Sequence, residues 1–351
     1  MKNGHITAGR LTAAAWAAVL APAVGILPGV TARIAGEGAW LAPLVALPAA
    51  LFLGRVLGRL ARQGLVQAFL RLLGGVAGRL LATIYIMWAL ILACARLRLS
   101  GQRLLFTAQR EVGLWFFLAL LAVVVAWLAW DKVDAFVRSA AIFSRILTLA
   151  LGAVLVLTVL QVRAENLWPL WAGDVLPVFR AAVPALGVLC YGVYAAFLWE
   201  GDADTGGWRR RVAGGCGMLA LLELSILGNM GAELTAALED PFITLSKHVG
   251  VKGAFQRVES LLSALWLLGD LALISLLLWA CRRMVAEAVP RWKGTWVVFV
   301  GVTAVLLGAG LVFRDAVLAQ RFEYVLAPLG NLALGVVVPG MLFLLDRQKN
   351  G

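Results

Sequence analysis

The chain has 351 residues, of which 62% are hydrophobic and only 14% are charged. A composition this apolar excludes a soluble globular protein and indicates a polytopic membrane protein. The formal net charge of +12 does not indicate nucleic-acid binding, because the basic residues lie in the gaps between apolar segments. In those gaps they act as signals for membrane topology.

Apolar windows of roughly 20 residues predict ten membrane-spanning helices, so the fold class is all-α. In chain order they cover about 6–30, 38–58, 76–99, 112–130, 139–162, 181–199, 212–234, 258–281, 292–313 and 323–345. The gaps between them hold only short loops, and the whole chain, 1–351, is predicted to be a single transmembrane domain. Most of the basic residues fall on one side when the N-terminus is cytoplasmic, so both termini are expected in the cytoplasm.

The first predicted span has an unusual second half, which contains Pro22, Gly25, Pro28 and Gly29. Proline lacks the amide that a helix needs, and glycine leaves helical dihedral angles at little cost. We therefore expect this helix to be discontinuous near mid-membrane, where freed main-chain groups are tolerated beside a cavity or against neighbouring polar groups. A simple proline kink is the alternative.

The sixth predicted span, about 181–199, is interrupted in a similar way by Pro184, Gly187 and Gly192. The first and sixth of ten spans are equivalent positions in a five-plus-five inverted repeat. Here the repeats would cover about 6–162 and 181–313, followed by a tenth helix at 323–345. Paired interruptions in equivalent spans indicate the binding site of a secondary transporter.

The two interruptions together predict a site for a small amino acid. Exposed amides of the first helix, around Ala23 to Ile26, would hold a carboxylate, and carbonyls near Cys190 to Val193 would accept from an ammonium group. Tyr191 and Tyr194 would cap the pocket or, alternatively, contact lipid and other helices. The candidate ligand-binding residues are Ala21, Ala23, Val24, Gly25, Ile26, Cys190, Tyr191, Gly192 and Tyr194.

Two carboxylates lie near the middle of predicted spans: Glu223 in the seventh and Asp270 in the eighth. Ionisable groups at this depth are costly and indicate function, so both are candidates for handling a proton or a cation. The alternative is a structural pair with a buried arginine such as Arg96 or Arg145. At the outer end of the eighth span, Arg257 and Glu259 are expected to form a local ion pair.

Catalytic motifs are missing from the sequence. There is no GxSxG, HExxH or phosphate-binding glycine loop, the four cysteines are scattered singly, and the only histidines are His5 and His248. We therefore expect no enzyme activity, no catalytic residue, no metal and no cofactor.

Three segments carry a resemblance to a known family. They are GEGAWLAPLVALPAALFLGRVLGRL at 36–60, NLWPLWAGDVLPVFRAAVPAL at 166–186 and PFITLSKHVGVKGAFQRVESLLSALWLL at 241–268. Together they resemble the B subunit of spore germinant receptors, the GerAB-type permeases of the amino acid–polyamine–organocation superfamily. The family's acidic-Arg-aromatic-acidic pattern at the eighth helix reads Gln256-Arg257-Val258-Glu259 here.

The resemblance implies a LeuT-like fold and recognition of a germinant, typically a small amino acid, in the inner membrane of a dormant spore. It also implies three kinds of partner, namely a receptor A subunit, a lipoprotein C subunit and membrane lipid. The chain departs from the family where Ala21-Pro22-Ala23 replaces a glycine-rich triplet and Tyr194 replaces an acidic residue. Two other functions stay open: an amino-acid transporter coupled to protons or cations, and a scaffold that holds partner subunits.

Overall fold

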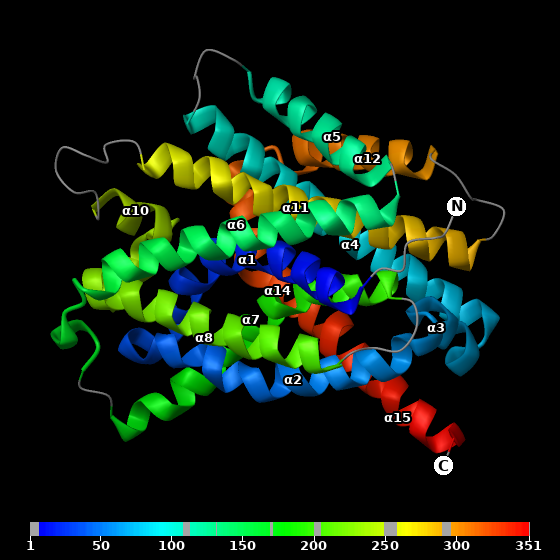
Figure 1. Ribbon diagram of the computed structural model, residues 1–351, viewed down its shortest axis with the longest axis horizontal. Coiled ribbons are helices and arrows are strands. Elements are labelled where there is room, and N and C mark those ends of the chain that lie inside the picture. The colour runs from blue at the N-terminus through cyan, green and yellow to red at the C-terminus, as the bar shows by residue number, and fades with distance from the viewer. Residues whose placement is uncertain are drawn as a thin grey trace.

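The computed structural model describes residues 7–107, 113–130, 132–168, 171–199, 205–248, 258–289 and 296–350. All regular secondary structure in these ranges is helical, as Figure 1 shows. The α-helices are α1 Ala8–Ala35, α2 Ala42–Leu60, α3 Leu65–Leu73, α4 Gly75–Thr107, α5 Leu114–Trp130, α6 Val133–Val159, α7 Val175–Leu189, α8 Thr205–Met230, α9 Ala232–Ala237, α10 Pro241–His248, α11 Val258–Ala288, α12 Trp296–Leu307, α13 Ala316–Arg321, α14 Ala327–Leu332 and α15 Val338–Asn350.

Shorter helical segments of other types join these α-helices. The 3₁₀ helices are η1 Gly36–Leu41, η2 Ala61–Gln63, η3 Ala164–Asn166, η4 Ala172–Asp174 and η5 Cys190–Leu198. Three π-helical segments, η6 Gly308–Val312, η7 Phe322–Leu326 and η8 Ala333–Val337, interrupt the last two apolar regions. A π-helical turn inside an α-helix frequently marks a functional position.

Seven helical segments of the described chain are long and apolar enough to cross a membrane. They are Ala8–Gln63, Gly75–Phe106, Val133–Val159, Val175–Leu198, Gly207–Met230, Ala264–Ala288 and Ala316–Lys349. The first of them runs through both α1 and α2, and two shorter apolar segments, Leu114–Trp130 and Trp296–Val312, lie in the regions of the fourth and ninth predicted spans. The protein is therefore an integral membrane protein.

Helix α1 lies at the centre of the bundle (Figure 1). It packs against α7, α11, α6, α8 and η5, and most of its side chains are buried. Small residues make this close packing feasible: a Cβ added at Gly269 of α11 would lie 2.8 Å from the Cβ of Ala21. Between Leu11 and Ala32 the residues of α1 are buried or half-buried, so this part of the helix faces other parts of the protein rather than lipid.

The prediction that the first span is discontinuous is wrong. Helix α1 continues from Ala8 to Ala35 through both Pro22 and Pro28. Each proline removes the hydrogen bond to the carbonyl four residues earlier, namely that of Ala18 for Pro22 and that of Val24 for Pro28. The helix remains continuous because it is packed against other helices over most of its surface.

The interruption of the sixth span takes the form of a change in helix type. Helix α7 ends at Leu189, and the chain continues directly as the nine-residue 3₁₀ helix η5, Cys190–Leu198. A 3₁₀ run longer than three or four residues is uncommon, because its hydrogen-bond geometry is poorer than that of an α-helix. This tighter segment carries Gly192 past α1 and thereby positions the cavity described next.

Candidate functional site

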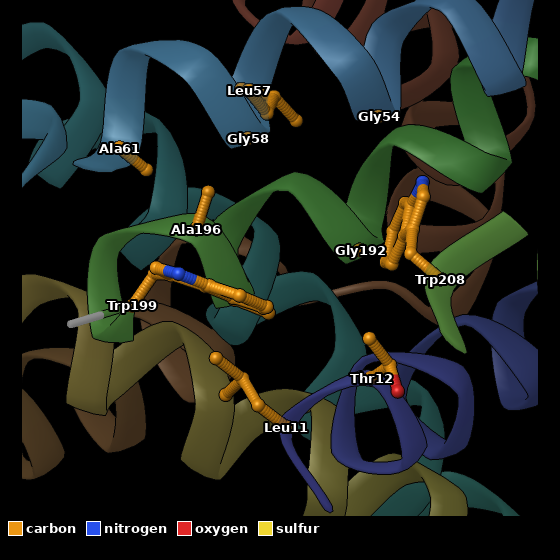
Figure 2. Close-up of a pocket in the computed structure, with 11 residues that line it drawn as sticks. Leu11, Thr12, Gly54, Leu57, Gly58, Ala61, Gly192, Ala196, Trp199 and Trp208 are labelled. Carbon is orange, nitrogen blue, oxygen red and sulfur yellow. The ribbon is translucent and has the colours of Figure 1, made fainter. Parts of the chain in front are cut away.

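A cavity of about 50 Å³ lies between α1, α2, η5 and the start of α8. Figure 2 shows the indole rings of Trp199 and Trp208 at opposite ends of the group, with η5 running between α2 and α1. Glycines contribute backbone without a side chain and so leave room. The lining consists of Leu11, Thr12, Gly54, Leu57, Gly58, Ala61, Gly192, Ala195, Ala196, Trp199 and Trp208.

A second cavity of about 40 Å³ adjoins the first and shares Thr12, Gly192 and Trp208 with it. Its wall also includes Trp16 of α1 and Arg211 of α8. The two spaces therefore meet where η5 passes between α1 and the first turn of α8.

The Trp208 indole packs against two glycines, Gly54 of α2 and Gly192 of η5, which have no side chain that would clash with the ring. A Cβ at Gly54 would overlap the Trp208 indole, and a Cβ at Gly192 would lie 3.7 Å from Trp208 Cη2 and 3.4 Å from Val19 Cγ2. The buried Trp208 Nε1 has no hydrogen-bond partner among the described residues. This N–H lies against Gly54 of α2, so an acceptor such as a ligand carboxylate would reach this unused donor only if the Trp208 side chain or α2 shifted.

Apart from Trp208 Nε1, the wall of the first cavity contains few polar groups. Thr12 Oγ1 donates to the Gly9 carbonyl at 3.1 Å, which leaves its oxygen available as an acceptor. Most other lining groups of the first cavity are aliphatic, aromatic or glycine backbone. Such a wall suits a small ligand with a short apolar part and few polar groups.

The structure separates the predicted ligand-binding residues. Gly192 lines both cavities, and it is the only one of the nine among the described residues that line them. The other eight lie elsewhere: in the middle of α1, where Gly25 alone is half-buried, or buried in η5 on sides that face other helices. They are Ala21, Ala23, Val24, Gly25, Ile26, Cys190, Tyr191 and Tyr194.

Two of those residues have clear surroundings. Tyr191 donates its hydroxyl proton to Glu323 Oε2 at 2.9 Å, so it joins a buried polar cluster. Cys190 packs against Gly335, where an added Cβ would lie 2.8 Å from the Cys190 Cβ. The cavity residues from α1 are Leu11 and Thr12, about three helical turns before Ala23. Sequence reasoning missed them because no proline or glycine marks that part of α1.

A buried charged cluster lies beside the site, built by Arg96, Ser100, Arg103, Asp270 and Glu323. Arg96 Nη2 lies 2.6 Å from Glu323 Oε2, and Arg96 Nη1 lies 3.6 Å from Asp270 Oδ1. Arg103 Nη1 and Ser100 Oγ donate to Asp270 Oδ2 at 2.9 and 2.8 Å. The two carboxylates balance the two guanidinium groups, so the cluster is formally neutral, as buried charges require.

This cluster connects four elements. Arg96 and Arg103 belong to α4, Asp270 to α11 and Glu323 to η7, while the Tyr191 hydroxyl attaches η5 to it. Asp270 is therefore paired with arginine, which is the alternative that its position in the sequence left open. Glu323 had no predicted role, although its place near the start of the last apolar region is visible in the sequence.

Glu223 has different surroundings from Asp270. It is only 1% exposed, its Oε2 lies 3.1 Å from Thr31 Oγ1, whose single proton is closer to the Leu27 carbonyl at 2.6 Å, and its Oε1 has no hydrogen-bond partner among the described residues. No Lys or Arg of the described chain forms an ion pair with it. An ionised carboxylate in this position is strongly disfavoured, and a proton or a bound cation removes the penalty.

The predicted pair of Arg257 and Glu259 lies outside the described side chains, because residues 249–257 and the side chain of Glu259 are not described. It stays a prediction.

Comparison with known proteins places the chain in a family. The model of the family described as "Spore germination protein" matches residues 5–311. No curated protein matches the chain.

Solved structures of transporters share the fold. The chain superposes with a TM-score of 0.68 on MHP1, a nucleobase-cation-symport-1 family transporter in a closed conformation with bromovinylhydantoin bound, at 14% identity over 96% of this chain and 77% of that one. For a Na⁺-coupled sialic acid symporter in its substrate-bound outward-open state the TM-score is 0.65, at 10% identity over 95% and 79%. For MhsT in complex with L-phenylalanine it is 0.58, at 16% identity over 97% and 98%.

Identities this low show the fold alone, which is that of LeuT-type transporters. The family match, by contrast, covers most of the chain, including the cavity and the buried charged cluster up to Asp270. This chain therefore belongs to the spore germination permease family.

Proposed function

We propose that the chain is the membrane subunit of a spore germinant receptor that binds a small amino acid in the cavity between α1, α2, η5 and α8. The observation that carries the proposal is the mainly apolar space around Gly192, next to the unused indole donor of Trp208. A ligand carboxylate would accept from Trp208 Nε1, and a short aliphatic side chain would fit against Leu57 and Leu11. The proposal keeps Gly192 from the predicted site and replaces Ala23 to Ile26 with Leu11 and Thr12.

The architecture that we propose around this site has ten membrane crossings in one transmembrane domain. The first repeat would cover about 6–162 and the second about 181–313, followed by a tenth helix near 323–345. Support comes from the division of Ala8–Gln63 into α1 and α2 and from the two shorter apolar helices that accompany the seven long ones. In the inner membrane of the spore, with both termini cytoplasmic, the chain would work with a receptor A subunit and a lipoprotein C subunit.

The direct test fills the cavity in spores that carry the whole receptor. Gly192→Leu projects a side chain into the space, and we expect the germinant concentration for half-maximal germination to rise at least tenfold. Germination is followed by the fall in optical density of the spore suspension, and membranes are probed with antibody to verify that the receptor is present at wild-type level.

Gly214→Leu is the matched control. Gly214 lies on α8, is exposed and has no atom within 4 Å of an added Cβ, so the same substitution there should leave the response unchanged. An unaltered dose–response for Gly192→Leu would instead favour the scaffold function, in which the cavity has no ligand.

A second candidate function is an amino-acid transporter coupled to protons or cations. The observation that favours it is the burial of Glu223 against Thr31 without a cationic partner in the described chain. A proton-coupled transporter containing this chain alone would accumulate labelled amino acid in proteoliposomes when a pH gradient is imposed, and Glu223→Gln would abolish the accumulation. Binding without accumulation in the wild-type protein would identify the chain as a sensor.

A further inference from the structure

A third cavity, which is polar, lies at the end of the molecule where α3 and α15 meet, opposite the end that carries α10 (Figure 1). Its volume is about 220 Å³. Charged and polar groups dominate its wall: three arginines, one glutamine and one aspartate. They are Arg59, Arg62, Arg71, Gln63 and Asp346.

The arginines outnumber the acidic partner. Asp346, which is only 4% exposed, is shared by two guanidinium groups: Arg59 Nε lies 3.2 Å from its Oδ2, and Arg71 Nη2 lies 2.9 Å from its Oδ1. Arg71 Nη1 also donates to Gln63 Oε1 at 3.1 Å. The formal charge of the lining is therefore +2. Because each guanidinium carries five N–H donors, the three arginines offer more donors than the Asp346 carboxylate and the Gln63 amide oxygen of this lining can accept.

The cavity lies at the ends of apolar helices, which indicates that it is at the level of the lipid headgroups. Three apolar segments begin or end here: Ala8–Gln63 ends within the wall, Ala316–Lys349 ends three residues after Asp346, and Gly75–Phe106 begins four residues after Arg71. The connecting helix α3 is amphipathic, with Leu65, Val66, Phe69 and Leu72 buried.

Exposed apolar side chains continue from the cavity toward the middle of the molecule. Phe52 on α2 is 55% exposed and Leu344 on α15 is 60% exposed. Between them Phe343 packs edge-on against Phe52, with ring centroids 6.4 Å apart, and the Arg59 guanidinium lies 5.3 Å from the Phe343 ring centroid. A basic recess thus lies directly above an exposed apolar strip, which is the arrangement that a phospholipid with an acidic headgroup would match.

We propose that the cavity formed by Arg59, Arg62 and Arg71 binds the phosphate headgroup of an anionic phospholipid, whose acyl chains lie along Phe52 and Leu344. The excess of positive charge selects an anionic headgroup over a zwitterionic one, and the apolar strip selects a lipid over a soluble phosphate. This site is independent of the cavity around Gly192, so its failure would leave the proposed germinant site untouched.

The test measures lipid binding to the purified full chain in detergent by native mass spectrometry. Phosphatidylglycerol, phosphatidylcholine with the same acyl chains and inorganic phosphate are titrated separately. An arginine near an anionic surface contributes about fivefold in affinity, so Arg59→Gln/Arg62→Gln/Arg71→Gln should weaken phosphatidylglycerol binding about a hundredfold. Phosphatidylcholine should bind the wild-type protein at least tenfold more weakly, and inorganic phosphate should not displace phosphatidylglycerol.

Two variants make the result decisive. Arg62→Gln keeps the ion pairs of Asp346 with Arg59 and Arg71 and should still weaken phosphatidylglycerol binding about fivefold, which guards against loss of fold in the triple variant. The control Arg79→Gln/Arg209→Gln/Arg210→Gln removes the same charge from exposed positions outside the cavity and should leave that affinity within about twofold. Equal weakening by both triple variants, or displacement by inorganic phosphate, would overturn the proposal.

Discussion

Glu223 and Asp270 show how one residue type at similar predicted depth can have different roles. Both side chains are buried, but Asp270 accepts from Arg103 and Ser100 and lies 3.6 Å from Arg96, whereas Glu223 has only the Thr31 hydroxyl within hydrogen-bond distance in the described chain. Two hydrogen-bond donors and the nearby guanidinium of Arg96 compensate the charge of Asp270, so it fixes helices relative to one another. Glu223 is compensated by at most one hydroxyl, which makes it the group that gains most from a proton or a cation.

The first prediction concerns that proton. A hydrophobic carbodiimide reacts with protonated carboxyl groups in apolar surroundings, so we expect it to label Glu223 in the purified protein at neutral pH and to spare Asp270. Peptide mass spectrometry after digestion locates the label. Glu223→Gln should remove the labelled peptide without lowering the unfolding temperature, since glutamine keeps the acceptor for Thr31. Labelling of Asp270 in preference to Glu223 would contradict this assignment.

The second prediction concerns the charged cluster. Glu323→Gln removes the carboxylate that lies 2.6 Å from Arg96 and leaves Arg96 with the more distant Asp270. Removing one partner of a buried pair costs about 3 kcal/mol, so the variant should unfold at a clearly lower denaturant concentration. Asp134→Asn, which breaks the ion pairs of Asp134 with the exposed side chains of Arg138 and Arg10, should cost less than about 1 kcal/mol. Similar losses for the two variants would contradict the structural role of the cluster.

At the scale of elements, the first and sixth predicted spans share a proline and glycine pattern but differ in structure. Both contain proline and glycine at equivalent places, yet α1 is continuous and the sixth span changes to 3₁₀ geometry at Cys190. The difference lies in their surroundings. Helix α1 is packed against α7, α11, α6, α8 and η5, and such tertiary contacts cannot be read from the local pattern.

Close packing of α2 on α8 gives the third prediction. A Cβ at Gly54 would overlap the Trp208 indole, so Gly54→Ala should destabilise the protein by about 1–3 kcal/mol and shift the wall of the cavity. Gly25→Ala is the control, because nothing lies within 4 Å of a Cβ there and alanine favours a helix by up to about 1 kcal/mol. Unfolding in denaturant measures both. Equal stability of the two variants would show that α2 and α8 do not pack this closely.

At the scale of the whole molecule, composition and hydropathy predict the membrane class, because bilayer thickness fixes the length of an apolar span. The three segments that resemble the family also predict the family correctly. The sequence could predict that Gly192 lies beside a cavity, because glycine has no side chain and leaves space that the sequence pattern indicates. The contribution of Leu11, Thr12 and Trp208 does not follow, because ordinary residues line this part of the space and only tertiary packing brings them together.

The buried cluster shows the same limit. Arg96 and Glu323 are separated by more than 200 positions in the sequence, and the sequence marks each one only as a charge within or beside an apolar segment. Their pairing depends on how α4 and η7 approach each other, so a single sequence cannot identify which charges meet.

The central claim is that the germinant lies between η5, α1 and α8. It is tested most directly by determining the structure of the intact receptor with a germinant amino acid bound, together with a germinant-free structure of the same complex. The account predicts ligand density in contact with Gly192, Thr12 and Trp208, with the ligand carboxylate within hydrogen-bond distance of Trp208 Nε1. Density beside Ala23 to Ile26, or in another subunit with this cavity unchanged, would contradict it.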